Sequence, residues 1–465
     1  MKFGVKNLCP IQEANLDIGD LTVVCGPNNT GKSYLTCSLF SFLSFMRNEI
    51  IHPISNEDMQ VFFEQGKIVV DLAKLAESYN SRLTNGNMKK FMEKLPEYLA
   101  RSSDRIKDAV VSVTLDTEEI KSRIIKLAFS KEQYWPVTEN CRIWLKKQKG
   151  QETIECRLDV NQLASELQSG NSPMEPPRPT KDVIIKSFHS LVSFLINRET
   201  PDAFIITCER TGVSLFLNEF NIFRDLAFSK KEDVFYELAD LRKRFDFKGY
   251  PLPIRRDQDF VQRLKEVVRR KSFIADDHPH VIKMFQFISG GEYILDEDTN
   301  SVRFMPTGTK DQLDLMESSS SVRSLMELNF YLKHIAKRGQ ILVIDEPEQN
   351  LNPANQRKMT YLLAMLVRAG IKVFVTTHSD YIIRELNALV MLNNLGEEKG
   401  KTICGEHNCP WEATLDFNSV RCYVMKDGQT HVMEGSPQNG FAVESFDDTI
   451  RSFNALHQDI IVSKE

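Results

Sequence analysis

The stretch "LTVVCGPNNTGKS", Leu21 to Ser33, decides the fold. Its opening "LTVVC" is an apolar run that fits a buried strand. The remainder, Gly26 to Ser33, matches the pattern G-x-x-x-x-G-K-S/T without a mismatch. In this pattern the glycines let backbone N–H groups turn inward around a phosphate group. The sequence therefore predicts a phosphate-binding loop between a strand and a helix.

Individual residues of this loop are expected to make different contacts. Lys32 is placed to reach the β- and γ-phosphates of a nucleotide, and the Ser33 hydroxyl is placed to contact Mg²⁺. Residues around the phosphates complete the expected set: Gly26, Asn28, Asn29, Thr30 and Gly31. A plain glycine-rich turn is the alternative, but a helical pattern from about residue 32 to 48 follows the loop. We therefore expect ATP and Mg²⁺ as cofactors.

Strand-like and helix-like segments alternate along much of the chain. Three further apolar runs end in polar residues, namely "DAFIITCERTG" (Asp202 to Gly212), "ILVIDEPE" (Ile341 to Glu348) and "VFVTTHSD" (Val373 to Asp380). Helical patterns separate them. This alternation predicts an α/β fold with a largely parallel central sheet.

Two adjacent carboxylates follow the apolar run "ILVI". At the end of a strand they repel each other unless a cation or a catalytic task offsets the cost. Asp345 fits a contact to Mg²⁺, directly or through water, and Glu346 fits the general base that polarises the attacking water. The alternative is a solvated strand end, which the phosphate loop upstream disfavours.

His378 follows the third apolar run. A lone histidine is usually structural, but ligands bind beyond the carboxyl ends of strands in open α/β sheets. The sequence therefore predicts that His378 senses the γ-phosphate of the nucleotide.

These motifs, in this order, resemble the ATP-binding-cassette heads of the SMC and OLD-like ATPases. The resemblance covers the phosphate loop, "IDEPEQNLNP" and "TTHSD", within about the first 50 residues and those from about 200 to 396. It implies an α/β ABC-type P-loop ATPase head with a mixed central sheet and helical insertions. By the same resemblance, Asn350 to Pro353 face a partner subunit, and Asn352 stands where that family often has a histidine.

Heads of this family act as dimers, and a signature stretch of one subunit holds the ATP of the other. Two stretches compete for that role. "ISGGE" (Ile288 to Glu292) looks similar to the usual signature, but Ser289 lies 56 residues before Asp345. In "ESSSSVRSL" the run Ser318, Ser319, Ser320 and Ser321 ends 24 residues before Asp345, which leaves room for one helix and a turn. We expect these serines to offer hydroxyls and helix N-terminal N–H groups to the partner's γ-phosphate.

A narrower resemblance is to the ATPase subunits of bacterial anti-phage defence systems such as PARIS, Septu and some retron modules. "SSSVRSLMELNFYLKHIAKRGQILVIDEPEQNLNP", "VFVTTHSDYIIREL" and "CERTG" carry it. In these systems an ATPase works beside a separately encoded effector, often a nuclease. The resemblance implies an ATP-driven switch that oligomerises and controls such an effector. An SMC-like DNA-repair ATPase and the motor subunit of an ABC transporter are the alternatives.

Composition narrows the class of protein. The chain has 465 residues, 42% of them hydrophobic, and a net charge of −5, so no overall basic balance points to nucleic acid. The basic stretch Arg263 to Ser272 reads as a solvated helix face and leaves nucleic acid open as a partner. There is no secretory signal, and the longest apolar run, Tyr34 to Met46, is too short to span a bilayer. No membrane partner is therefore expected. Nine cysteines without regular spacing favour a reducing cytoplasm.

The sequence predicts six segments. Residues 1–55 form the N-terminal part of the ATPase head with the phosphate loop, 56–147 form a helical insertion, and 148–213 return to the head. Residues 214–285 are helical, 286–396 carry the signature, acidic and histidine motifs, and 397–465 form a C-terminal region. The last region has no D-x-D pair, so no nuclease is expected from it. Whether Cys404, His407 and Cys409 bind zinc stays open, as does the choice of Gln65 or Gln148 as a Mg²⁺-sensing glutamine.

Overall fold

The computed structural model describes residues 1–442 apart from 51, 53, 129–132, 139–140, 160–178, 199, 217–248, 297 and 300, and also residues 452 and 454–461. The chain divides into two compact units. Unit 1 comprises Met1–Ser41, Met92–Val113 and Ala203–Glu465, and unit 2 comprises Phe42–Phe91 and Thr114–Asp202.

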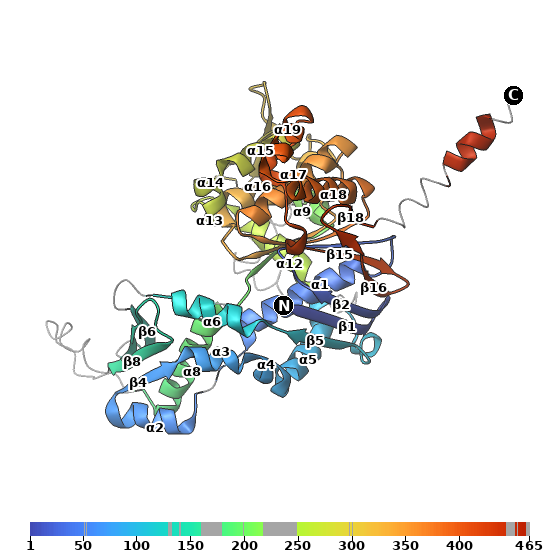
Figure 1. Ribbon diagram of the computed structural model, residues 1–465. Coiled ribbons are helices and arrows are strands. Elements are labelled where there is room, and N and C mark those ends of the chain that lie inside the picture. The colour runs from blue at the N-terminus through green and yellow to red at the C-terminus, as the bar shows by residue number, and fades with distance from the viewer. Residues whose placement is uncertain are drawn as a thin grey trace, which may run out of the picture. The chain divides into compact units, whose positions relative to one another are not determined.

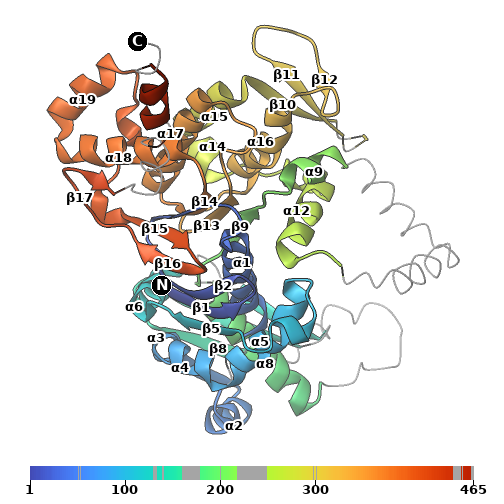
Figure 2. The same cartoon turned by 90° about the vertical axis from the view of Figure 1, so that its right-hand side faces the viewer.

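A nine-stranded sheet forms the centre of unit 1 in the described part of the chain. Strands β15, β3, β14, β13 and β9 are parallel neighbours, whereas β1 pairs with β2, and β15 with β16, in antiparallel fashion. The sheet is therefore mixed, and Figure 2 shows β14, β13 and β9 side by side. The strands are, in spatial order, β5 (Val110–Thr114), β1 (Lys2–Leu8), β2 (Ile11–Asp17), β16 (Gln429–Val432), β15 (Val420–Lys426), β3 (Leu21–Cys25), β14 (Lys372–Thr377), β13 (Ile341–Asp345) and β9 (Ala203–Ile206).

The central strands are buried on both faces because helices cover the sheet. Every residue of β3 and β13 is buried, which explains why both are continuous apolar runs. Figure 1 shows α15, α16, α17 and α18 grouped on one side of this sheet. The larger helices of unit 1 are α12 (Leu252–Gln262), α15 (Pro279–Ser289), α16 (Ser320–Phe330), α17 (Pro353–Arg368), α18 (Asp380–Asn394) and α19 (Glu397–Glu406), and α1 (Lys32–Glu49) begins here.

The C-terminal region belongs to the same sheet, which the sequence interpretation missed. Residues 397–465 were expected to follow the ATPase head as a separate region. Instead β15 pairs with β3 in register Val420↔Leu21, and β15 and β16 are joined through Asp427 and Gly428. Both residues of this turn have positive φ, 50° and 74°, which suits a tight hairpin. The strand that carries the phosphate loop is thus flanked by the C-terminal hairpin.

The "ISGGE" stretch ends a helix and starts a strand. Helix α15 stops at Gly290, whose φ of 71° is left-handed, and β10 (Gly291–Asp296) begins at the next residue. β10 pairs with β11 (Ser301–Pro306) and β11 with β12 (Leu313–Asp314) in a small sheet. The helical interpretation of 214–285 holds for α12, α13 (Leu264–Val267), α14 (Phe273–Asp277) and α15, while 217–248 lie outside the described residues.

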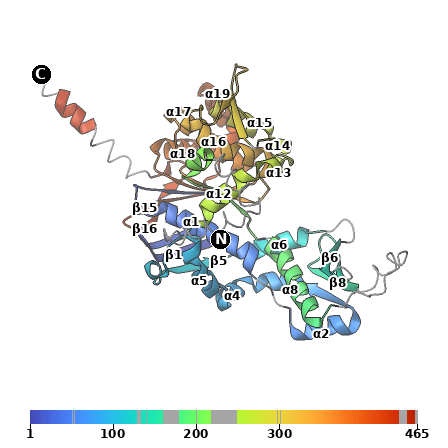
Figure 3. The same cartoon turned by 180° about the vertical axis from the view of Figure 1, so that it is seen from behind.

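Unit 2 corrects the expectation of a mostly helical insertion at 56–147. A four-stranded antiparallel sheet lies in it, in the order β4, β8, β7, β6, and Figure 3 shows α8 beside β6 and β8. The strands alternate buried and exposed residues, a period that the charge-rich sequence conceals. Its elements are α2 (Asn56–Gln65), β4 (Lys67–Asp71), α3 (Leu72–Glu77), α4 (Tyr79–Arg82), α6 (Thr117–Lys126), β6 (Gln133–Thr138), β7 (Cys141–Lys146), β8 (Thr153–Asp159) and α8 (Lys181–Arg198), with α5 (Met88–Tyr98) leading out of it.

Among the helices that the structure describes, none combines the length and the apolar character needed to cross a bilayer. The predicted division into six segments differs from the two units, and its boundaries remain predictions.

Candidate active site

Strand order brings the three predicted motifs to one edge of the sheet. β3 pairs with β14, and β14 with β13, all parallel. The last residues of the strands are therefore in register, with Cys25 opposite Thr377 and Asp345 opposite Thr376. The phosphate loop, the acidic pair and His378 follow these positions directly. The structure thus places all three motifs beside one another, where ligands bind in α/β sheets.

The phosphate loop has the backbone that its glycines allow. Gly26 has φ 149°, and a Cβ at this position would lie 2.3 Å from the Met425 carbonyl oxygen of β15. Gly31 has φ 105°. The buried Lys32 donates from Nζ to the carbonyl oxygens of Gly26, at 2.9 Å, and Pro27, at 2.8 Å. The lysine is therefore held inside the loop, while Asn28, Asn29 and Ser33 are exposed.

The acidic pair divides into one buried and one half-buried side chain. Asp345 is 3% exposed, and its Oδ1 accepts a hydrogen bond from Thr376 Oγ1. Glu346 has φ 55°, a left-handed conformation that costs a non-glycine residue about 1–3 kcal/mol. Its N–H donates to the Thr376 carbonyl at 3.1 Å, and its side chain is 25% exposed. The backbone thus turns the carboxylate of Glu346 out of the sheet, at the end where the phosphate loop lies.

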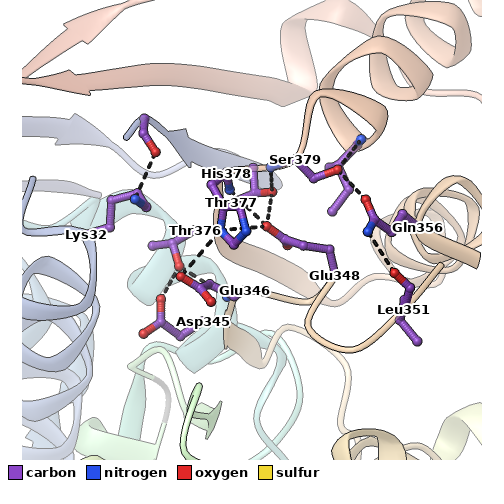
Figure 4. A network of polar contacts seen from close by, with 12 residues as sticks. Lys32, Asp345, Glu346, Glu348, Leu351, Gln356, Thr376, Thr377, His378 and Ser379 are labelled. Atoms are coloured by element: carbon purple, nitrogen blue, oxygen red, sulfur yellow. Dashed lines mark hydrogen bonds and ion pairs between the residues drawn. The ribbon is translucent and has the colours of Figure 1, made fainter. Parts of the chain in front are cut away.

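His378 lies between two glutamates, as Figure 4 shows. Its Nδ1 is 3.5 Å from Glu346 Oε1 and 3.4 Å from Glu348 Oε1. Glu348 is the buried partner: its Oε1 accepts from Thr377 Oγ1 at 2.7 Å and from the His378 N–H at 2.9 Å. Burial raises the pKa of Glu348, and these hydrogen bonds oppose the rise. The histidine backbone is therefore fixed by an acid that follows the predicted pair.

Charges converge on Lys32. Burial lowers the pKa of its ammonium group, and the nearby carboxylates of Glu346, Asp345 and Glu348 oppose this effect. The edge thus combines the buried lysine with three acids. Such a set can bind a polyanion with a divalent cation, because the cation offsets the repulsion between phosphates and carboxylates.

The serine run starts a helix, as predicted. Ser319 is the N-cap of α16, and its Oγ accepts from the Val322 N–H at 3.3 Å. The first turn contains no acidic residue, so nothing there competes with an anionic ligand. Ser319 and Ser320 are exposed, and Ser321 is half-buried. Ser318 differs from the other three: it is 6% exposed and donates to the Asp314 carbonyl at 2.9 Å, so its hydroxyl points into the protein.

Asn352 caps the next helix. Its exposed side chain accepts from the Asn355 N–H at 3.0 Å and so begins α17. Further along α17, Gln356 donates to the Leu351 carbonyl at 2.8 Å and accepts from Ser379 Oγ at 2.6 Å. The loop that carries Asn352 is thereby tied to the residue after His378 (Figure 4).

Sequence reasoning missed two polar residues at this edge, Glu348 and Thr376, which were seen only as neighbours of the motifs. Arg210 lies in "CERTG", and the resemblance to the anti-phage ATPases implies that it stands at a strand end near the nucleotide, whereas an arginine considered by itself is more often part of a structural ion pair. Arg210 is 2% exposed and donates to the backbone carbonyls of Asp345 and Glu346. The third acid of "DEPE" was the one available signal for Glu348, since a buried acid after two others needs its own partners.

The weaker motifs do not assemble a site. The described residues contain no group of three or more side chains suited to a metal ion, and Cys404 and Cys409 are free thiols. Within the basic stretch 263–272, the short helix α13 turns Leu264 and Val267 inward. Ser289 of "ISGGE" donates to the Gly291 carbonyl at 2.9 Å, which is a helix-end contact.

A phosphate loop, an acidic strand end and a histidine strand end on adjacent parallel strands define a P-loop ATPase. Comparison with known families agrees, because residues 1–383 match the family described as "AAA ATPase domain". The chain belongs to that family, and it is an ATPase. The predicted α/β P-loop ATPase fold with a mixed central sheet is confirmed. No curated protein matches the chain.

Solved structures similar to this chain are heads of SMC proteins. One is an SMC head bound to the C-terminal winged-helix domain of ScpA, with TM-score 0.32, 11% identity and coverage of 94% of this chain and 97% of the other. A second is an SMC head with an extended coiled coil, bound to the C-terminal domain of ScpA derived from Pyrococcus furiosus. Its TM-score is 0.31 at 11% identity, and the match covers 98% of each chain. The SMC head domain from Thermotoga maritima has a TM-score of 0.29 at 12% identity, and the match covers 94% of this chain and 98% of the other. The family assignment rests on the match over residues 1–383.

Proposed function

We propose that this ATPase is a switch whose copies assemble around ATP and whose nucleotide state controls a separately encoded effector protein. The effector we expect is a nuclease of anti-phage defence, in the cytoplasm. ATP hydrolysis itself follows from the family. The assembly and the control of a partner are the proposal.

We assign the following roles within one subunit. Lys32 and the loop N–H groups hold the phosphates, and Ser33 with Asp345 would hold Mg²⁺, which when bound neutralises charge on the phosphates. Glu346 orients the attacking water, and His378 contacts the γ-phosphate. The residues present fit this ligand, since the lysine and the acids converge on a loop in which Asn28, Asn29 and Ser33 are exposed.

The single observation that carries assembly is the exposed start of α16. Its N-terminal N–H groups and the hydroxyls of Ser319, Ser320 and Ser321 form an anion-binding end with no acidic residue in the first turn. The exposed Asn352 belongs to the loop that joins β13 to α17, and Ser324 Oγ of α16 donates to the Gln349 carbonyl of this loop at 3.2 Å. The serine run and the loop with Asn352, the two stretches expected to contact the ATP of another copy, are thus linked within one subunit. A single surface for the γ-phosphate of another copy requires such a link.

The test of assembly uses Glu346→Gln. Loss of a positioned base should slow turnover about a hundredfold or more while ATP stays bound. The ATP-bridged dimer should then accumulate and elute early in size-exclusion chromatography with ATP, but not with ADP. A variant that remains monomeric with ATP at saturating concentration refutes assembly around ATP.

Control of an effector is tested separately, by co-purification with the product of a neighbouring gene in the presence of ATP or ADP. ATP can shift that contact only by favouring one conformation over the other. Retention that depends on nucleotide supports the proposal, and the purified ATPase alone should leave plasmid DNA and tRNA intact.

The second candidate is an SMC-like DNA-repair ATPase, which would use the same ATPase fold and the same residues at the carboxyl ends of the strands. Such a protein needs long heptad arms. Unit 2, in its described residues, instead holds an antiparallel sheet and helices of at most 18 residues. DNA-stimulated hydrolysis without an effector would favour this candidate over the first.

A further inference from the structure

Arg210 opens the short helix α9 (Arg210–Leu215) directly after strand β9 and is 2% exposed. Its guanidinium makes four hydrogen bonds, and all four acceptors are backbone carbonyls. Nε donates to Ser324 at 3.0 Å, and Nη1 donates to Thr207 at 2.8 Å and to Asp345 at 2.7 Å. Nη2 donates to Glu346 at 2.6 Å. One side chain therefore joins three separate segments of the chain.

Two of these segments have different roles in the proposed function. Asp345 and Glu346 act on the subunit's own ATP, whereas α16, which carries Ser324, begins with the serines that contact the partner's ATP. The Glu346 peptide is left-handed, so its direction depends on contacts rather than on local preference. The bond from Arg210 to its carbonyl is one of those contacts. Arg210 thus lies between the start of α16 and the proposed base.

A buried acid on the same helix interacts with Arg210. Glu327 is one turn beyond Ser324, is 0% exposed, and has no hydrogen-bond partner for either carboxylate oxygen among the described residues. Burial raises the pKa of Glu327 well above its ordinary value, and the charge of Arg210 opposes this rise. Burial likewise lowers the pKa of Arg210, and Glu327 and Asp345 oppose that effect. A movement of α16 therefore shifts both a bonded carbonyl and a buried acid that is electrostatically linked to Arg210.

We propose that Arg210 is a positioning residue that couples the serine run, which senses the ATP of the partner, to Glu346, which acts on the subunit's own ATP. This inference rests on the proposed assembly around ATP. When the partner's γ-phosphate draws the start of α16 toward it, Ser324 and Glu327 move with the helix. Arg210 follows them and sets the direction of the Glu346 peptide. Each subunit then hydrolyses its own ATP only when its partner is also loaded.

The coupling is measured as cooperativity of hydrolysis. Arg210→Lys keeps a charge but loses the planar fork, so it cannot hold carbonyls of three segments together. We expect nucleotide affinity of the dilute subunit to stay within about twofold, kcat to fall about tenfold or more, and the Hill coefficient for ATP to fall from above 1 toward 1. A purely structural arginine would instead lower stability and affinity together.

The matched control is Arg368→Lys, because Arg368 also donates to backbone carbonyls, those of Trp411 at 3.2 Å and Thr414 at 3.4 Å, away from the site. It should leave kcat and the Hill coefficient unchanged. If Arg210→Lys fails to fold, Glu327→Gln replaces the buried acid beside Arg210 with an amide of the same shape and should lower the Hill coefficient in the same way.

The size-exclusion behaviour of Glu346→Gln with ATP separates the two possible failures. If the ATP-bridged dimer forms and the Arg210→Lys and Glu327→Gln variants both keep the wild-type Hill coefficient, the coupling is refuted and the assembly stands. If no dimer forms, the assembly is refuted and the coupling with it.

Discussion

Glu348→Gln tests whether the third acid of "DEPE" places His378. The change keeps the size of a side chain that is 3% exposed, and it keeps a carbonyl oxygen that can accept from Thr377 and from the His378 N–H. It removes the negative charge 3.4 Å from His378 Nδ1. Only the strength of these contacts changes, so the substitution isolates the charge.

The expected size follows from two hydrogen bonds. A bond to a charged acceptor contributes about 1.5–3 kcal/mol and a neutral one about 0.5–1.5 kcal/mol, so the two bonds to Glu348 weaken by about 2 kcal/mol in total. Removing a buried charge offsets much of this loss in the folded protein, because burial raises the pKa of Glu348. We therefore expect unfolding free energy to change by less than about 1 kcal/mol. If the histidine loses its position in the transition state, about 2 kcal/mol corresponds to a roughly 30-fold fall in kcat.

The assay is steady-state ATP hydrolysis with a parallel measurement of ATP affinity and melting temperature. Affinity should not fall, because Lys32 and the loop make no hydrogen bond to Glu348 in the described structure, and the loss of a negative charge near Lys32 does not disfavour a polyanion. Glu385→Gln is the matched control, since Glu385 is also a buried acid, with its side chain 8% exposed and bound to Arg357 away from the site. Wild-type kcat in Glu348→Gln, or an equal fall in the control, refutes the positioning of His378 by this charge.

Three further predictions address other parts of the protein. Lys32→Ala should abolish ATP binding in a titration, because the loop lysine neutralises the phosphates; unchanged affinity removes the nucleotide assignment. Bulky residues at Ser320 and Ser321 should spare binding to a single subunit and block hydrolysis, whereas the same change at Ser289 should leave hydrolysis intact, and the reverse result would make "ISGGE" the signature. Burial raises the pKa of Asp257 from its ordinary 3.8 to about 7, so the folded protein loses stability as the pH rises through that window. Asp257→Asn removes this loss, and its melting temperature relative to wild type should rise between pH 5 and pH 8; a constant difference contradicts the raised pKa.

The edge of the sheet could be predicted because each motif is continuous in the sequence. The loop, the acids and His378 each follow an apolar run directly, and parallel strands end at a common edge. Their adjacency needed no knowledge of side-chain packing. The start of α16 could also be predicted from neighbouring residues alone, since serines favour the N-cap of a helix regardless of the tertiary fold.

Residues that act through distant partners could not be predicted in this way. The bond from Arg210 to Ser324 spans 114 positions, and that from Thr377 to Glu348 spans 29. Neither hydrogen bond produces a repeating pattern of residues that could be recognised in the sequence. The C-terminal hairpin is an intermediate case: Asp427 and Gly428 are a local turn signal, but the pairing of β15 with β3 depends on the whole sheet. The same pairing explains Gly26, because the Met425 carbonyl occupies the space of a side chain.

The geometry of Glu346 is the point at which these long-range contacts meet. Its left-handed backbone is not the local preference of a glutamate, so the surrounding structure must maintain it. Its N–H donates to Thr376 of β14, the strand just before His378, and its carbonyl accepts from Arg210, which also binds the helix of the serine run. The backbone of the proposed base is therefore held from two sides, by segments that the sequence separates from it. A displacement of either segment therefore changes the direction of the Glu346 backbone, and the proposed coupling predicts that such a displacement alters the rate of ATP hydrolysis.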